Sequence, residues 1–277
     1  MSVSAVILTL NEEENLPACL KALEWCDDIV VLDSFSTDRT VEIARAAGAR
    51  VFQRAFDCEP HQRNFSLKEI DYVHPWVYTP DADEICTPEL RDEMLAIARD
   101  PARQEVLFMV RYRNIFMGRW IRRSSLYPTW TPRFMRPDRV HYERLIHPRC
   151  LGEGPVGRLQ SHYDHHSFNK GLAAWYDKHN RYSSNEATLA TVTDEPTPIQ
   201  WRDLFSSDTA DRRYALKALA ARLPFRPTQR FLYMYVLRGG FLDGWAGYTY
   251  CRMLASYELM IEVKAVELRR LQKGQST

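Results

Sequence analysis

Several features that would narrow the class of this protein are missing from its sequence. The 277 residues include 37 basic and 36 acidic side chains, so the formal charge is only +1. No overall positive field therefore points to nucleic acid as a partner. No apolar run reaches the roughly 20 residues that span a bilayer. The start, MSVSAVILTLNEEEN, lacks the basic and long apolar segments of a signal peptide, so we expect none.

Cysteine is scarce and irregularly spaced. The six cysteines, at positions 19, 26, 58, 86, 150 and 251, form no CxxC pair, which argues against a structural zinc site. Without a secretion signal, we expect reduced thiols in a cytoplasmic protein. Internal repeats and low-complexity tracts are missing as well. The 45% hydrophobic and 26% charged content is typical of a globular chain, with one large domain or one domain plus an extension.

Short apolar runs alternate with helical patterns over the first hundred residues. Strands are predicted at 4–10, 27–34, 50–56 and 75–84. Helices are predicted after each of them, at 11–26, 36–49, 60–70 and 87–100. This alternation, with its short connections, predicts an α/β fold: a Rossmann-like, mostly parallel sheet flanked by helices.

Acidic side chains gather where these strands end. The segment WVYTPDADEICT, residues 76–87, carries Asp81, Asp83 and Glu84 directly after an apolar run. Burying such charges costs on the order of several kcal/mol each unless something pairs them, so we expect either a bound cation or an exposed turn. Ligands of such sheets lie at the carboxyl ends of the strands, where TLNEE, LDSFSTD and PDADE should converge. The acids are therefore predicted to line a cleft.

The pattern changes after residue 105. Segments 105–123 and 129–149 are rich in aromatic residues and arginine, and are predicted to form strands and loops beside the sheet. From about residue 168 the chain is predicted to be helical, in segments 168–190, 198–223, 228–244 and 246–272. We expect an α/β domain at 1–165 and a helical C-terminal extension at 166–277.

The chain resembles the family 2 glycosyltransferases of the GT-A fold in four segments that keep the family's order and spacing: ILTLNEEENLPACLKAL, VVLDSFSTDRTVEIA, QRNFSL and YTPDADE. The less specific segments GEGPVGRL, HHSF, KHNRYS and LRGGFLDGWAG resemble the subgroup that includes lipopolysaccharide-core glucosyltransferases. The resemblance implies an inverting, metal-dependent transfer of a sugar from a UDP-sugar to a hydroxyl of a cell-envelope glycan or lipid-linked acceptor.

The resemblance also assigns roles to residues. Asp83 would bind Mg²⁺ or Mn²⁺ directly, with Asp81 nearer the ribose and the metal's waters, because hard cations favour carboxylate oxygens. Such a cation neutralises the departing diphosphate. Asp33 would accept a hydrogen bond from uracil, with Arg63 near the base, which favours UDP without excluding GDP. Further nucleotide contacts would come from Thr9, Leu10, Asn11, Glu12 and Ala82.

These residues also have purely structural interpretations. A D-x-D pattern is frequent by chance and is then an exposed turn. Asp33 would serve as a helix cap, although Asp38 or Ser36 is better placed for that. Arg63 would lie on a solvated helix face.

The catalytic base is the least defined element of the site. Inverting transfer needs a carboxylate that takes the proton of the acceptor hydroxyl. The resembled subgroup carries a His-Glu pair before the EGPVGRL segment, but here Pro148 follows His147. We favour Glu143 as the base and keep Asp138 and Glu153 as alternatives.

A second hypothesis keeps the fold without the chemistry. Because Pro148 follows His147 where the subgroup has His-Glu, a GT-A domain that has lost its base is the alternative: a catalytically impaired nucleotide-sugar-binding or scaffold protein. The structural alternative for Glu143 is a pairing with Arg139 or Arg144 on a surface strand. A nucleotidyltransferase would carry a glycine-rich basic loop after the first strand, whereas this chain has the acidic, glycine-free NEEEN.

The segment GRWIRRSSLYPTWTPRFMR supplies further candidates. Arginine binds diphosphates and other anions, and tryptophan stacks on sugar rings. The residues considered for the diphosphate or the acceptor are His147, Arg122, Arg123, Arg133 and Trp130. Solvated edge charges and core aromatics are the structural alternative.

Aromatic and basic residues also mix in the helical extension, as in RPTQRFLYMYVLRGG and KAVELRRLQK. Amphipathic helices of this composition lie in bilayer interfaces, but an apolar stripe also serves packing within a protein. The expected location is the cytoplasm, with the cytoplasmic face of the inner membrane as a contact surface. The donor sugar, the acceptor, the linkage and the oligomeric state do not follow from the sequence.

Overall fold

The structure is a computed structural model that describes residues 3–143, 149–192, 202 and 225–276. It divides into two compact units. The first contains residues 1–120 and 127–169, and the second contains residues 121–126 and 170–277. Each unit is described on its own below.

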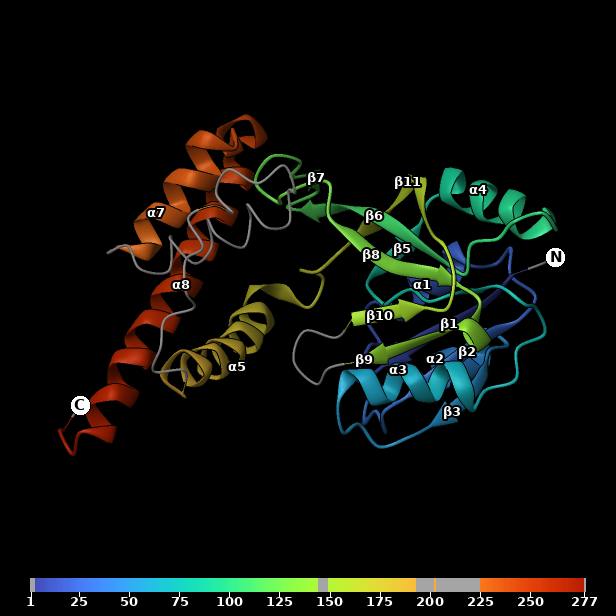
Figure 1. Cartoon of the computed structure of the whole chain (residues 1–277), viewed down its shortest axis with the longest axis horizontal. Coiled ribbons are helices and arrows are strands. Elements are labelled where there is room, and N and C mark those ends of the chain that lie inside the picture. Colours follow the sequence, from blue (N-terminus) through green and yellow to red (C-terminus); the bar gives the residue numbers. More distant parts are fainter. Residues whose placement is uncertain (1–2, 144–148, 193–201, 203–224, 277) are drawn as a thin grey trace. The chain divides into compact units, whose positions relative to one another are not determined.

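The first unit is built on a mixed sheet, which has nine strands within the described residues (Figure 1). Its parallel part has the order β3-β2-β1-β4, formed by β1 (Ser4–Thr9), β2 (Ile29–Asp33), β3 (Arg50–Gln53) and β4 (Val77–Tyr78). Strand β8 (Trp130–Met135) then runs antiparallel between β4 and β6. The remaining strands of the sheet are β5 (Glu84–Cys86), β6 (Leu107–Phe116), β7 (Arg119–Trp120) and β11 (Val156–His165).

Helices cover both faces of this sheet because strand residues alternate between the faces. Ala5 and Ile7 of β1 belong to a core cluster with residues of α1 (Leu16–Ala22), α2 (Thr40–Ala46) and α4 (Pro88–Arg99). Val6, between them, faces the other side and joins the cluster of Ile70, against which Phe65 of α3 (Glu59–Lys68) packs. This confirms the predicted α/β fold with helices on both faces.

Two predicted boundaries change in the structure. The strand expected at 75–84 is two strands, because Pro80 to Asp83 form a turn between β4 and β5. Strand β5 pairs antiparallel with β11 instead of continuing β4. The aromatic segments after residue 105 extend the sheet itself through β6, β8 and β11, and add a separate hairpin of β9 (Val140–Glu143) and β10 (Arg149–Gly152), which follows the short helix η1 (Pro137–Arg139).

The second unit is helical, as predicted. It contains α5 (Gly171–Val192), α7 (Arg226–Leu232), the π-helix η3 (Tyr233–Leu237), the 3₁₀ helix η4 (Gly240–Asp243) and α8 (Gly244–Gln272). Helix α8 packs against both α5 and α7. The predicted helix at 198–223 lies outside the described residues, apart from Arg202. Among the described helices, none combines the length and the apolarity that crossing a membrane requires.

Candidate functional site

The carboxyl ends of β1, β2 and β4 meet at one edge of the sheet. Thr9 lies opposite Asp33 in the register of β1 and β2, and the Thr9 hydroxyl donates to Asp33 over 3.0 Å. Leu8 forms a parallel bridge with Asp81, just beyond β4. The sequence prediction that these three polar strand ends converge is therefore confirmed.

Asp33 is fully buried and has four hydrogen bonds within the protein. One oxygen accepts from the hydroxyls of Thr9 and Ser36. The other accepts from the Ser36 backbone N–H over 2.9 Å and from the Gln53 amide over 3.1 Å. A carboxylate offers about four acceptor positions, so a further donor such as uracil N–H would have to replace one of these partners.

The loops that follow β1 and β2 are fastened to each other. The Asn11 side chain accepts from Thr37 N–H, while the Asn11 backbone N–H donates to the Ser36 hydroxyl, both over 2.8 Å. The backbone N–H groups of the next two residues donate to Thr40 and Asp38. Two of the residues proposed to contact the nucleotide, Asn11 and Glu12, thus belong to one hydrogen-bonded double loop, residues 11–13 and 36–40.

Asp38 also accepts from the Thr40 backbone N–H at the start of α2, over 2.9 Å. Asp38 therefore contacts the first residue of α2, although the N-cap residue of this helix is Arg39, which has no side-chain cap hydrogen bond.

Two arginines hold the carboxylate of Asp81. Arg63 of α3 donates to one oxygen over 3.1 Å, and Arg133 of β8 donates to the other. Burial alone would raise the pKa of Asp81, but the charges of Arg133 and Arg63 outweigh it and hold that pKa well below its usual range. Arg63 is itself buried and also pairs with Glu59 over 2.9 Å, so it does not lie on a solvated helix face.

Glu84 is buried beside Asp81. Arg133 donates to its Oε1 over 2.6 Å, and the Asp81 backbone N–H donates to its Oε2 over 3.1 Å. Burial raises the pKa of Glu84, and the neighbouring Asp81 charge adds to this rise, while Arg133 opposes it. The acidic segment is thus no exposed turn: buried arginines of the protein pair two of its three charges.

Asp83 faces a histidine instead. Its Oδ2 lies 3.3 Å from Nε2 of His165, the last residue of β11, and both side chains are about one-quarter exposed. The next residue, His166, donates its backbone N–H to the Asp83 carbonyl over 2.8 Å. Burial lowers the pKa of His165, but the carboxylates of Asp83, Glu84 and Asp81 together raise it above its usual value. One carboxylate oxygen and one imidazole nitrogen, both reachable from solvent, form a donor pair that suits a divalent cation.

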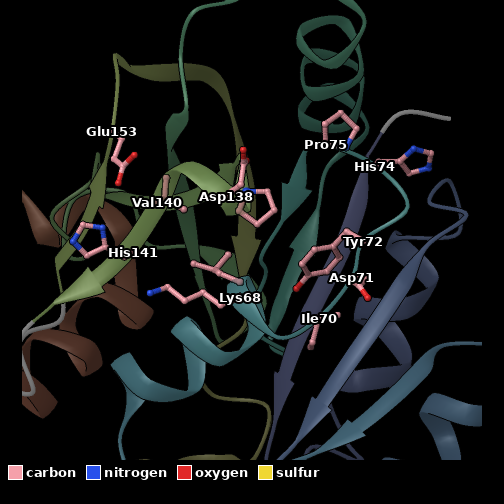
Figure 2. A pocket seen from close by; sticks show the side chains of 12 residues that line it. Lys68, Ile70, Asp71, Tyr72, His74, Pro75, Asp138, Val140, His141 and Glu153 are labelled. Carbon is pink, nitrogen blue, oxygen red and sulfur yellow. The ribbon is translucent and has the colours of Figure 1, made fainter.

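The three acids considered for the base do not lie together. Asp138 and Glu153 line a pocket of about 870 Å³ that also includes His74 and Pro75, the residues just before β4 (Figure 2). This pocket is therefore at the amino end of β4, opposite the edge that carries Asp81. Of the three candidates, only Glu143 is next to a residue that contacts the arginines around Asp81. Its neighbour Tyr142 packs on Arg63, with 5.6 Å between the ring centroid and the guanidinium carbon.

Glu143 nevertheless points away from that contact. Strand neighbours alternate in direction, and Tyr142 is buried while the Glu143 side chain is 53% exposed. Its Oε1 lies 3.1 Å from Nε2 of His141, which lines the pocket of Figure 2. No ion pair of Glu143 with Arg139 is found among the described residues; Arg139 donates to the Glu153 carbonyl instead.

The remaining candidates have varied surroundings. Leu10 is exposed at the loop after β1, and Glu12 accepts from the Asn15 amide over 2.8 Å, whereas Ala82 is buried in the core. The guanidinium carbons of Arg111 and Arg158 lie 5.8 and 5.3 Å from the ring centroid of Trp130.

Three further candidates lie outside the sheet or outside the described residues. Arg122 and Arg123 belong to the second unit, not to the sheet. His147 lies outside the described residues.

Residues 4–164 match the model of the Glycosyl transferase family 2. The match covers more than half of the chain, and the chain belongs to this family. Its sheet with flanking helices is the GT-A fold.

Two curated relatives are similar to parts of the chain. The lipopolysaccharide core biosynthesis glycosyltransferase LpsC of Rhizobium meliloti (strain 1021) is 29% identical over 172 residues, which are 58% of this chain and 61% of that protein. An uncharacterized glycosyltransferase of Rickettsia typhi is 36% identical over 93 residues, which are 33% of this chain and 31% of that protein. The chain therefore spans less than two thirds of either relative.

Among solved structures, the chain is similar to glucosyl-3-phosphoglycerate synthase from Mycobacterium tuberculosis in complex with Mn²⁺, uridine diphosphate and glucosyl-3-phosphoglycerate. The sequence identity is 24% and the TM-score 0.34, over 45% of this chain and 47% of that chain.

Sequence reasoning missed the part that β11 plays. The HHSF segment was noted, but the pairing of β11 with β5, which brings His165 to Asp83, joins residues 82 positions apart. A histidine doublet at the end of a strand was the available signal.

Proposed function

We propose that this chain is an inverting, metal-dependent glycosyltransferase that moves a sugar from a UDP-sugar to a hydroxyl of a cell-envelope glycan or lipid-linked acceptor. One observation carries the proposal: Asp33, Asp81 and the Asp83–His165 pair lie at the same carboxyl edge of the sheet. Ligands of open α/β sheets bind at this edge. The name of the Rhizobium relative, which refers to lipopolysaccharide core biosynthesis, supports an envelope acceptor.

The nucleotide would lie against the ends of β1 and β2 and the double loop that follows them, residues 11–13 and 36–40. In this proposal Asp33 exchanges its hydrogen bond with Gln53 or Ser36 for one with the uracil ring. Thr9, Leu10, Asn11, Glu12 and Ala82 are the further contacts, and Arg63 keeps Asp81 ionised beside the ribose.

Asp83 and His165 fit a divalent cation, Mg²⁺ or Mn²⁺. The imidazole nitrogen favours Mn²⁺ over Mg²⁺, because Mg²⁺ prefers an all-oxygen shell. When bound, the cation would supply positive charge to the departing diphosphate. Two protein ligands leave room for oxygens of the substrate.

Glu143 remains the proposed base. It would take the proton of the acceptor hydroxyl while the acceptor oxygen bonds to the anomeric carbon. The bond from that carbon to the diphosphate oxygen breaks on the opposite face, which inverts the configuration. Turning the Glu143 side chain away from His141 would precede this step.

The exposed position of Glu143 and its contact with His141 also favour the second candidate function, a catalytically impaired nucleotide-sugar-binding protein. The two candidates share the nucleotide site and differ in turnover.

The first test is thermal stabilisation by UDP and by GDP, each with Mn²⁺ or with EDTA. A ligand that binds only the native state raises its stability. We expect a UDP-selective rise in Tm that EDTA and Asp83→Ala both abolish, with Asp138→Asn as the matched control that keeps it. No rise with either nucleotide would contradict the proposed site.

The second test separates the two candidates. Release of UDP from UDP-sugars in the presence of an envelope glycan acceptor indicates a transferase. A UDP-selective rise in Tm without turnover of any UDP-sugar would favour the binding protein.

A further inference from the structure

The turn that joins α7 to α8 is built tightly from glycine. We call residues 233–245 the hairpin tip. Gly239 and Gly244 have φ angles of +74° and +66°, which favour glycine. A Cβ on Gly240 would lie 2.6 Å from the Met234 carbonyl oxygen, and one on Gly247 would lie 2.2 Å from the Gly240 carbonyl oxygen. The tip therefore has one well-defined backbone path.

A buried aspartate fixes this path further. Asp243 Oδ2 accepts from the backbone N–H groups of Arg123 and Ser124, both over 2.8 Å, and from the Ser124 hydroxyl over 2.7 Å. Segment 121–126 of the second unit thus clamps the tip from outside the hairpin. The conformation of the tip is a built feature of this unit.

The tip turns its large apolar side chains outward. Leu237, Trp245 and Leu242 are 79%, 71% and 62% exposed, and about half of Phe241 and Val236 is exposed as well. The small residues Gly240, Ala246 and Gly247 occupy the interior instead. Large apolar side chains exposed within one short segment indicate an interaction site, and here the glycine-dependent turn and the contacts of Asp243 fix the backbone that carries them.

Aromatic rings continue this surface along the hairpin. The ring centroids of Trp245 and Tyr248 lie 5.2 Å apart, and those of Tyr235 and Tyr248 lie 5.6 Å apart. Tyr235 also meets Phe241 at 6.3 Å. With Gly244, these four rings line a depression of about 280 Å³. Tryptophan and tyrosine are the side chains that favour the boundary between lipid and water.

The charge around the tip is positive. Residues 225–257 contain four arginines and one acidic residue, Asp243, whose carboxylate is the buried one described above. The charge of Arg226 is balanced by Glu258, 2.8 Å away, so the positive charge of this range comes from Arg230, Arg238 and Arg252. Two more arginines, Arg122 and Arg123, precede Ser124 and are exposed. Lysine and arginine close to an anionic bilayer contribute about 1 kcal/mol each.

We propose that the hairpin tip docks on a bilayer that contains anionic lipid, with Phe241, Leu242 and Trp245 entering the interface and the arginines meeting the headgroups. An anionic bilayer matches both observations, outward apolar side chains on a fixed turn and a rim of arginines. The surface is distinct from the far end of α8, where the basic segment KAVELRRLQK lies. The inference does not depend on the proposed glycosyl transfer.

The test is co-sedimentation of the full chain with phosphatidylcholine vesicles, with and without phosphatidylglycerol. We expect binding that requires phosphatidylglycerol and weakens with salt. The double variant Phe241→Ser with Trp245→Ser should lose about tenfold or more in partition coefficient. Arg238→Gln should lose about fivefold, which corresponds to about 1 kcal/mol for one arginine.

Leu271→Ser is the matched control, because Leu271 is a similarly exposed apolar residue at the other end of α8. It should bind vesicles like the wild type, and circular dichroism should show the same melting for all variants. Wild-type protein that ignores anionic vesicles would overturn the proposal, as would equal binding by the double variant. A dimer that the double variant loses would assign the tip to a second copy of the chain instead.

Discussion

Arg133 and Glu84 form an ion pair in the interior of the first unit, with 2.6 Å between Nη2 and Oε1 and side chains that are only 7% and 2% exposed. The same guanidinium holds Asp81. A single residue of β8 therefore pairs both the buried carboxylate of Glu84 and the partly exposed carboxylate of Asp81 at the end of β4.

Replacing Arg133 with methionine should strongly destabilise the protein. It keeps much of the volume but removes the ion-pair partner of the buried Glu84 and leaves Asp81 with Arg63 alone. Loss of one partner of a buried ion pair typically costs about 3–5 kcal/mol. The free energy of unfolding from urea titrations measures this. Arg139→Met, at an exposed position nearby, should change it by less than about 0.5 kcal/mol. Equal effects of the two substitutions would contradict the role given to Arg133.

His165→Ala should weaken Mn²⁺-dependent binding of UDP while leaving the fold intact. A protonated imidazole does not bind a metal, and the carboxylates around His165 raise its pKa. Binding should therefore weaken as the pH falls, starting at a higher pH than for an unperturbed histidine. Calorimetric titration of UDP with Mn²⁺ at several pH values measures this. In the variant the pH dependence should disappear; an unchanged profile would exclude His165 as its source.

Glu143→Gln should reduce turnover at least about a hundredfold, with the UDP-dependent rise in Tm unchanged. The substitution removes the acceptor of the proton without changing the nucleotide site. Glu153→Gln serves as the control and should retain activity. Glu153 directly follows β10, the partner strand of β9 that ends at Glu143. If Glu153→Gln abolishes turnover and Glu143→Gln does not, the base has been misassigned.

Asp28 should make the stability of the first unit pH-dependent. Burial raises its pKa, but hydrogen bonds from the Ser4 hydroxyl, Val73 N–H and Arg50 outweigh this and lower it. A carboxyl whose pKa is lowered on folding stabilises above its unfolded pKa of about 3.9, and this is lost as the pH falls through the folded value. Asp28→Asn should therefore cost about 1–3 kcal/mol at pH 7.

The cost of Asp28→Asn should shrink in acid, because the wild-type carboxyl is then protonated too. Chemical denaturation of both proteins at pH 7 and below pH 4 measures the difference. A cost that does not change with pH would show that packing, not charge, is the reason.

Gly247→Ala should destabilise the second unit, since the added methyl would lie 2.2 Å from the Gly240 carbonyl oxygen. Crowding of this kind typically costs about 1–3 kcal/mol. Gly274→Ala is a less suitable control because of its positive φ; Ser256→Ala on α8 is preferable. Circular dichroism melting of both variants measures the effect, and equal Tm values would contradict the tight packing described for the tip.

The sequence predicted the parallel half of the sheet well because each strand there is a short apolar run with a local turn signal. Thr9, Asp33 and Asp81 follow such runs directly, so their convergence required only the rule for parallel strands. The pairing of β5 with β11 was not predictable in this way. It depends on contacts between distant segments: the acidic cluster with Glu84 and the histidine doublet with His165 are each visible in the sequence, but nothing local indicates that they pair.

Arg133 illustrates the same limit. The sequence singled it out as a contact for an anionic substrate, and its charge does meet anions, but these are Asp81 and Glu84 of the protein itself. Arg122 was grouped with it on proximity in sequence, yet the chain passes into the second unit at Ile121. Local composition identified an arginine-rich region without indicating which partner each side chain faces.

The double loop that joins residues 11–13 to residues 36–40 has a kinetic consequence. Its cross-connections involve backbone groups of both loops, so neither loop opens without breaking several hydrogen bonds of the other. A nucleotide would therefore meet a loop backbone that is already in its final shape, with only one side-chain partner of Asp33 to be exchanged, and little backbone conformational entropy would be lost there on binding. Association at this edge should proceed in a single phase that is linear in nucleotide concentration, as rigid docking does.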